Sequence, residues 1–120
     1  DPQYFASAAK IASLLDKPRE IWIFSDEPQL ALELLSPVIP QIKVAPLSSN
    51  TSGLETLLLM SKCHGLVASN STYSWWAAFM MGEGKPIVFP RPFFLEGSVP
   101  EPKHLLLNSW IQIGRDTSVA

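Results

Sequence analysis

The chain has 120 residues, of which 47% are hydrophobic and 17% charged. This is enough to build the core of one domain and too apolar for a disordered segment. A net charge of −2 argues against binding along a nucleic-acid backbone, and a single cysteine excludes a disulfide framework or a cysteine-based metal cluster. No signal peptide and no apolar run of ~18 residues is seen. The sequence therefore predicts a soluble segment, with the full-length protein cytoplasmic or membrane-associated.

The hydrophobic pattern predicts helices and strands that alternate along the chain. Asp1 suits a helix N-cap and Pro2 the first helical turn. The expected elements are a helix from Asp1 to Leu15, a strand at 21–24, a helix at 29–35, a strand at 42–44, a helix at 54–62, a strand at 65–69, a helix at 72–81, a strand at 86–89 and a last short strand at 110–113. Gly82 and Gly84 end the fourth helix, and residues 90–104 form an irregular loop.

This alternation predicts an α/β fold, a Rossmann-like parallel sheet flanked by helices, formed as a single domain over residues 1–120. The run from Ile21 to Phe24 is uniformly apolar, as expected of a strand buried on both faces of the sheet. The leucines and Met60 of the helix at 54–62 are expected to pack on the sheet.

Polar turns follow two of the expected strands, and ligands of open parallel sheets bind at the carboxyl ends of strands. Ser25-Asp26-Glu27 and Ser69-Asn70-Ser71-Thr72 are therefore expected to line one edge. Hydroxyls and unpaired N–H groups at a helix start suit a diphosphate, and an acidic side chain suits the N–H groups of a base or the hydroxyls of a sugar. The alternative is that Asp26 and Ser71 are ordinary helix N-caps.

Aromatic residues offer further ligand or partner contacts. We expect Trp76 to belong to the core, and Trp75, nearer the polar turn, to be the more available for stacking on a ligand. Phe93 and Phe94 are candidates for an exposed acceptor or partner surface. The polar loop 47–53 suits a solvated connector or a ligand contact equally well. Neither a dinucleotide fingerprint nor a P-loop is present.

The stretch from Leu58 to Phe79 reads LLMSKCHGLVASNSTYSWWAAF. It resembles the signature of glycosyltransferase family 11, the α-1,2-fucosyltransferases: L-M-S-x-C, an apolar strand, then N-S-T-[FY]-S-W-W-[GA]-A. The run Ile23–Glu27 is similar to the acidic F-S-D-D motif of this family, and Pro86–Pro90 resembles the strand that follows the signature.

The resemblance implies the C-terminal, donor-binding half of a GT-B-type enzyme that moves fucose from GDP-fucose to a galactose 2-hydroxyl of an oligosaccharide. It implies an inverting transfer without a metal or other cofactor. The donor contacts that it implies are Asp26, Glu55, Thr56, Asn70, Ser71, Thr72, Ser74 and Trp75. Thr56 stands where the family often has an aspartate thought to read guanine, and the adjacent Glu55 is the substitute. No catalytic base is identified.

The H-x-R-R-G-D motif of the family, whose arginine contacts the donor diphosphate, is absent from these residues. It is expected in an upstream N-terminal half, the partner domain in the full-length protein, so the isolated chain is expected to be inactive. Two alternatives remain: a nucleotide-binding α/β domain without transfer activity, and a structural domain in which both polar turns are only helix caps.

Overall fold

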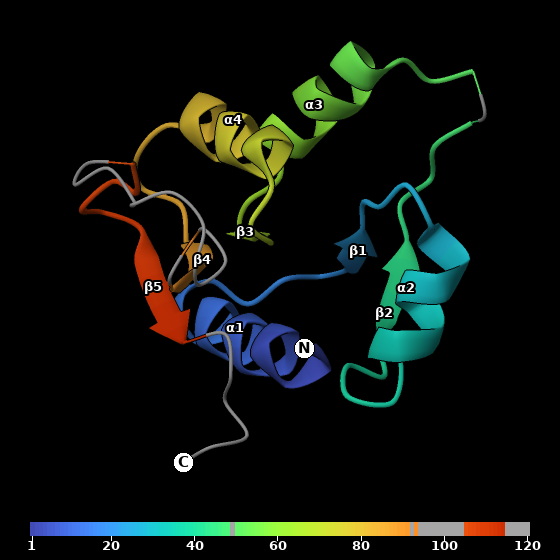
Figure 1. Cartoon of the computed structure of the whole chain (residues 1–120), viewed down its shortest axis with the longest axis horizontal. Coiled ribbons are helices and arrows are strands. Elements are labelled where there is room, and N and C mark those ends of the chain that lie inside the picture. Colours follow the sequence, from blue (N-terminus) through green and yellow to red (C-terminus); the bar gives the residue numbers. More distant parts are fainter. Residues whose placement is uncertain (49, 92, 94–104, 115–120) are drawn as a thin grey trace.

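The structure is a computed structural model that describes residues 1–48, 50–91, 93 and 105–114. Within these residues helices and strands alternate, as predicted (Figure 1). The elements are α1 (Pro2–Leu15), β1 (Ile21–Ile23), α2 (Pro28–Leu35), β2 (Ile42–Val44), α3 (Gly53–Ser61), β3 (Leu66–Val67), α4 (Thr72–Met81), β4 (Ile87–Arg91) and β5 (Ile111–Gly114). Every strand pairing is parallel, so the prediction of a Rossmann-like α/β fold is confirmed.

The start of α1 and the end of α4 carry the expected signals. The Asp1 carboxylate accepts a hydrogen bond from the Gln3 N–H at 2.9 Å and caps α1. Gly82 follows α4 with a φ of 75°, a conformation that side chains disfavour, and so ends this helix.

The core lies on the two faces of the sheet formed by β3, β4 and β5. Because side chains alternate along a strand, neighbouring residues of β4 point to opposite faces. Ile87 and Phe89 join a cluster with Ala78 and Met81 of α4, whereas Val88 joins Tyr4 of α1. The sheet is therefore a middle layer, with α1 on one side and α4 on the other (Figure 1).

Helix α1 is fixed to this sheet by a polar contact as well as by its apolar face. The Tyr4 hydroxyl donates to the Ala68 carbonyl at 2.6 Å, and the Val88 carbonyl lies 3.5 Å from the same hydroxyl. Ala68 follows β3 directly. The first turn of helix α1 thus holds the end of β3, the strand that leads into α4.

The hydrogen-bonded strands form two sheets rather than the one expected: β1 pairs with β2, and β3, β4 and β5 form a separate set. Strands β1 and β3 contain three and two residues, which offer few backbone groups for a joining ladder. The prediction that Ile21–Phe24 is buried on both faces is wrong, since only Ile23 is buried. The other three residues are only half-buried, because a two-stranded sheet is too small to be covered on both faces.

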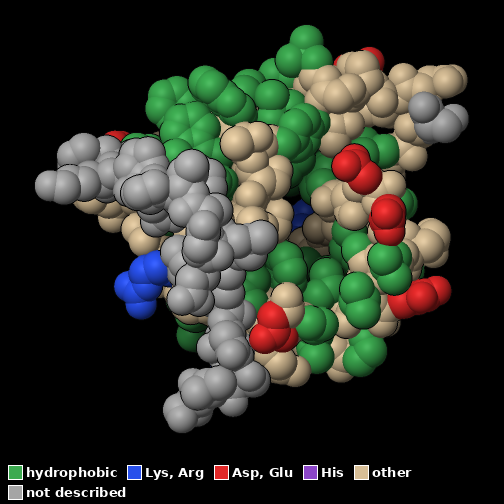
Figure 2. Space-filling model, viewed as in Figure 1, with side chains coloured by type: hydrophobic (Ala, Val, Ile, Leu, Met, Phe, Trp, Pro, Cys, Tyr) green, Lys and Arg blue, Asp and Glu red, His purple; other side chains and the backbone are tan. Residues whose placement is uncertain are grey.

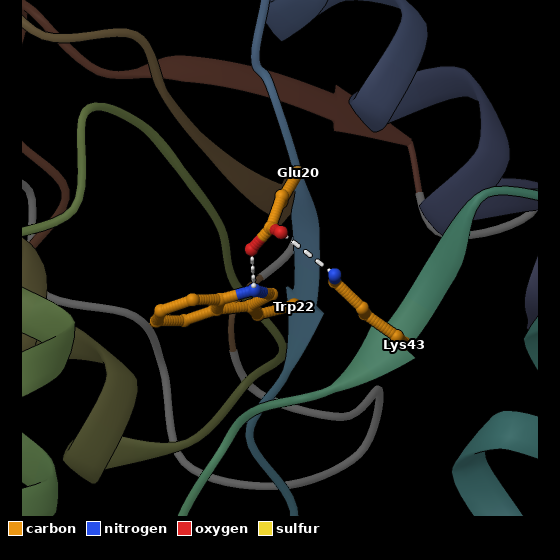
Figure 3. Close-up of polar contacts among 3 residues, drawn as sticks. All are labelled: Glu20, Trp22 and Lys43. Carbon is orange, nitrogen blue, oxygen red and sulfur yellow. Dashed lines mark hydrogen bonds and ion pairs between the residues drawn. The ribbon is translucent and has the colours of Figure 1, made fainter.

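A polar network ties the two strands of the smaller sheet together. Figure 3 shows Glu20 between Trp22 and Lys43. One carboxylate oxygen accepts from the Trp22 indole N–H at 2.7 Å, and the other pairs with the Lys43 ammonium at 2.7 Å. These bonds, led by the one from Lys43, hold the pKa of Glu20 below its ordinary value of 4.5.

Helix α3 does not pack on the sheet as expected. It packs mainly on α4, and of its apolar residues only Met60 is buried, while Leu54 and Leu58 are exposed. None of the helices in the described part of the chain is long and apolar enough to cross a membrane.

Candidate functional site

The polar turn after β3 is the N-terminus of α4, and Ser71 is its N-cap, as one of the two alternatives predicted. The Ser71 hydroxyl oxygen accepts from the Tyr73 N–H at 3.1 Å and from the Ser74 N–H at 3.2 Å. A hydroxyl has two lone pairs and one hydrogen, so Ser71 keeps its hydrogen to donate. The cap therefore presents a hydrogen-bond donor, polarised by two backbone N–H groups, at the positive end of a helix.

The N-terminus of α3 is closed by a capping box, in which two residues satisfy each other's backbone. The Ser52 hydroxyl accepts from the Glu55 N–H at 3.1 Å, and Glu55 Oε1 accepts from the Ser52 N–H at 3.4 Å. The Thr56 hydroxyl donates back to the Ser52 carbonyl at 3.0 Å. Glu55 and Thr56 thus lie in the first turn of α3, and the capping bond from the Ser52 N–H to the Glu55 carboxylate is long.

The two helix starts are joined by Tyr73, whose hydroxyl donates to the Gly53 carbonyl. Gly53 is the first residue of α3, and Tyr73 is the second residue of α4. This bond brings the predicted residues of α3, Glu55 and Thr56, to the same corner as the start of α4. We call this arrangement the α3–α4 corner; it consists of Ser52–Thr56 and Asn70–Ser74.

The corner combines features that suit an anion. Two helices begin at it, each with the positive end of its dipole there, and the remaining polar side chains at the start of α4 are available. Asn70 and Thr72 are exposed and Ser74 is half-buried, and their side chains make no hydrogen bond to another described residue. The one charge within these two stretches is the Glu55 carboxylate, which suits the N–H groups of a ligand rather than its phosphates.

Trp75 is held by packing. Its indole N–H donates to the Leu105 carbonyl at 2.6 Å. Its ring stacks on the Phe79 ring with centroids 5.4 Å apart. The expected order of the two tryptophans is reversed: Trp76 is the exposed one. The reason is that the inward side of α4 at this height meets Trp110, which contacts Trp75 edge-on. The Trp75 side chain is half-buried, so a ligand could contact only the part of its ring that Phe79 and Trp110 leave exposed.

Asp26 has no hydrogen bond that connects it with the described residues of the α3–α4 corner. It is exposed in the turn after β1, and its carboxylate makes no hydrogen bond or ion pair to another described residue. It is not the N-cap of α2 either, since Glu27 holds that position without a side-chain bond. Because β1 and β3 belong to different sheets, the expected common edge of Asp26 and Ser71 is not established by strand pairing.

Several other sequence expectations also have an outcome. Phe93 is buried rather than exposed, because it packs on Phe89 with ring centroids 6.0 Å apart. Phe94 lies outside the described residues. The loop before α3 is closed by Ser48 and Thr51, whose hydroxyl oxygens lie 3.1 Å apart.

Sequence reasoning missed the residues that assemble the corner. The spacing Ser52-x-x-Glu55 is a capping-box signature and could have been found. The contact between Tyr73 and Gly53 joins residues 20 apart, and no local pattern announces it. Arg91 was missed as well: it ends β4 and is exposed, a cation at the carboxyl end of the strand beside β3.

Comparison with known proteins places the corner inside a recognised region. The model of glycosyl transferase family 11 matches residues 37–112, a range that contains the whole α3–α4 corner but not Asp26. The chain is similar to the O-antigen biosynthesis glycosyltransferase WbnK of Escherichia coli, with 30% identity over 111 residues. That alignment covers 92% of this chain and 35% of the relative, so the chain spans about a third of its length. No solved structure was found to match.

Proposed function

The chain belongs to glycosyl transferase family 11, and on that premise we propose that it is the donor-binding half of an α-1,2-fucosyltransferase that uses GDP-fucose. The observation that carries this proposal is the α3–α4 corner, where the bond from Tyr73 to Gly53 brings two helix N-termini together. Two such ends at one place supply the backbone N–H groups and the positive potential that a diphosphate requires.

The diphosphate is assigned to the start of α4. The Ser71 hydroxyl donates its remaining hydrogen to a phosphate oxygen, and the Thr72 N–H, which no described residue uses, donates beside it. The side chains of Asn70, Thr72 and Ser74 add further donors. When fucose leaves, negative charge grows on GDP, and donors already in place stabilise it at little reorganisation cost. In this proposal no metal is needed for that task.

The base is assigned to the start of α3. Guanine presents adjacent N–H groups that a carboxylate accepts, whereas uracil offers only one such group. The long 3.4 Å bond from the Ser52 N–H to Glu55 Oε1 is readily exchanged for a bond to guanine. Thr56 supports this arrangement through the helix cap, and Asp26 is left to contact the nucleoside or its neighbours.

Transfer to the 2-hydroxyl of a galactose-containing oligosaccharide needs groups beyond these. No catalytic base is identified among the 120 residues, and the H-x-R-R-G-D motif is absent from them. We therefore expect residues 1–120 to bind the donor as a single nucleotide-sugar-binding domain and to transfer fucose only together with an N-terminal half.

Calorimetry on the chain with GDP, GDP-fucose and UDP, each with and without EDTA, tests the proposal. We expect both guanine nucleotides to bind, UDP to bind at least tenfold more weakly, and EDTA to change nothing. Equal affinity for GDP and UDP would point instead to a nucleotide-binding module without base selection. No binding of any nucleotide would contradict donor binding by this chain.

Tyr73→Phe tests the corner itself, because it deletes only the hydroxyl that bonds to Gly53. Loss of one hydrogen bond costs about 0.5–1.5 kcal/mol, and we expect GDP affinity to fall by roughly 3- to 10-fold. Ser61→Ala is the matched control: it removes a hydroxyl that donates to the Leu58 carbonyl at 2.7 Å near the far end of α3. If both variants bind GDP as the wild type does, the joined helix ends are not the site.

A further inference from the structure

Helix α4 is apolar on the side that faces away from the sheet as well as on the side that packs on it. Ala77, Ala78 and Met81 are buried. On the opposite side Trp76, Phe79 and Met80 are 54%, 51% and 44% exposed. No residue from Thr72 to Met81 is charged. A helix that is hydrophobic all round is normally covered on both sides, which indicates that a partner belongs here.

Helix α3 extends the same exposed surface. Leu54 and Leu58 are 65% and 41% exposed, and α3 packs against α4. Figure 2 shows hydrophobic side chains gathered over the top of the molecule, where these two helices lie. We call Leu54, Leu58, Trp76, Phe79 and Met80 the apolar α3–α4 face. Monomeric proteins rarely expose a contiguous apolar patch of this kind without a binding role.

The face is connected to the core by a chain of aromatic contacts. Phe89, which is fully buried, stacks on Trp110 with ring centroids 4.7 Å apart, and the centroids of Trp110 and Trp75 lie 6.0 Å apart. Trp75 in turn stacks on Phe79, which meets Trp76 edge-on at 6.1 Å. The exposed rings are therefore held in place before any partner arrives, so association loses little side-chain entropy.

The chemistry of the face selects a protein partner. A lipid surface attracts helices that carry lysine or arginine beside the apolar residues, and neither α3 nor α4 contains one. A carbohydrate needs several hydrogen-bonding groups, and of the five side chains of the face only Trp76 carries an N–H donor. What remains is a second apolar surface of similar shape.

The area matches a dimer of this chain. An aromatic side chain buries about 150–250 Å² when covered, and leucine and methionine bury somewhat less, so the five half-exposed side chains contribute roughly 500 Å². Homodimer interfaces are about 65% apolar. If the five side chains supply that apolar part, the whole interface covers roughly 800 Å² per copy. That is the usual share of one partner in a stable interface. We infer that the apolar α3–α4 face binds the same face of a second copy of this chain.

The arrangement is two-fold, with each helix pair lying on the helix pair of the other copy. Such a contact is self-complementary, because each side supplies the same residues. It also brings no like charges together at its centre, since Glu55 at the start of α3 is the one charged residue of the two helices. This inference does not depend on the proposed nucleotide site.

Sedimentation velocity of the 120-residue chain tests the inference. At tens of micromolar we expect an apparent mass twice the 13.3 kDa of the chain, falling toward 13.3 kDa on dilution. Trp76→Glu places a charge at the centre of the face and should weaken the dimer at least 100-fold. Phe79→Lys should do the same with the opposite charge, and circular dichroism reports whether each variant is folded.

Leu14→Glu is the matched control, because Leu14 is 79% exposed at the end of α1, outside the face. We expect this variant to dimerise as the wild type does. A wild-type chain that stays at 13.3 kDa up to hundreds of micromolar would overturn the inference, whichever other partner covers the face. A dimer that survives in folded Trp76→Glu and Phe79→Lys would also overturn it, as would co-sedimentation of a monomer with phosphatidylcholine vesicles.

Discussion

The two sheets of this fold differ in what holds them together. Around β3, β4 and β5, residues such as Phe89 and Val88 are completely buried between α1 and α4. Around β1 and β2, only Ile23 among the strand residues is buried, and α2 buries none of its residues. The smaller sheet has the buried residues Ile39 and Ala45 beside β2, and exposed polar contacts of Glu20 join its two strands.

The helix starts show the same contrast. At α4 the Ser71 hydroxyl caps two N–H groups, and at α3 a capping box is complete. At α2 the N-cap is Glu27, and its side chain makes no capping bond. The turn into α4 therefore rests on the well-packed sheet, and the start of α3 is held to that turn by the bond from Tyr73 to Gly53. The acidic turn at Asp26 rests on the weaker sheet.

The largest effect expected from this difference is on core packing. Phe89→Ala should lower the free energy of unfolding by about 3–5 kcal/mol, since it removes a fully buried ring that stacks on Trp110. Phe24→Ala, just after β1, should cost roughly 1–2 kcal/mol because that ring is half-buried. Urea unfolding measures both. Equal losses would show that the two sheets share one core.

A smaller effect is expected at the helix caps. Ser71→Ala should destabilise the chain by about 1 kcal/mol, because two N–H groups of α4 lose their acceptor. Glu27→Ala at the corresponding position of α2 should change stability by less than about 0.5 kcal/mol, since no capping bond is lost. Thermal unfolding checks the pair, and a larger loss for Glu27→Ala would show that the start of α2 is the more strongly capped of the two.

The smallest effect is the pH dependence of the β1–β2 pair. The pKa of Glu20 is held below 4.5 by Lys43 and Trp22. A lowered pKa means that Glu20 contributes stability above pH 4.5 and loses it as the pH falls through its folded value. The NMR signal of the Trp22 indole N–H, which bonds to Glu20, should therefore shift with a midpoint below 4.5.

Lys43→Met is the control for this titration. Without the ammonium group the midpoint should move up toward 4.5, since the largest cause of the lowered pKa is gone. A midpoint that is the same in both proteins would show that the pair in Figure 3 has no electrostatic effect on Glu20.

Local patterns in the sequence predicted the elements well, and long-range packing explains where they failed. The Asp1 cap, the stop at Gly82 and the bounds of α4 are local, and all three are confirmed. That Trp75 is packed and Trp76 is exposed was not predictable, because their burial depends on the position of Trp110, more than thirty residues away. An apolar helix gives no periodicity that marks its inner face.

The candidate site was predictable only in part for the same reason. The run Asn70–Thr72 is recognisable as an anion-suited helix start, and the family signature covers it. That α3 begins beside it follows from one side-chain bond between Tyr73 and Gly53. The division into two sheets depends on strands of two and three residues, too short for their partners to be read from the sequence.

The hydrogen bond from Tyr4 to Ala68 has a practical consequence for anyone who trims or fuses this segment. The family match begins at residue 37, so a boundary chosen from it would discard α1. Such a truncation would strip the cover from one face of the central sheet and remove the donor that holds the end of β3. The stretch covered by the family match is thus shorter than the part of the chain that packs around the central sheet.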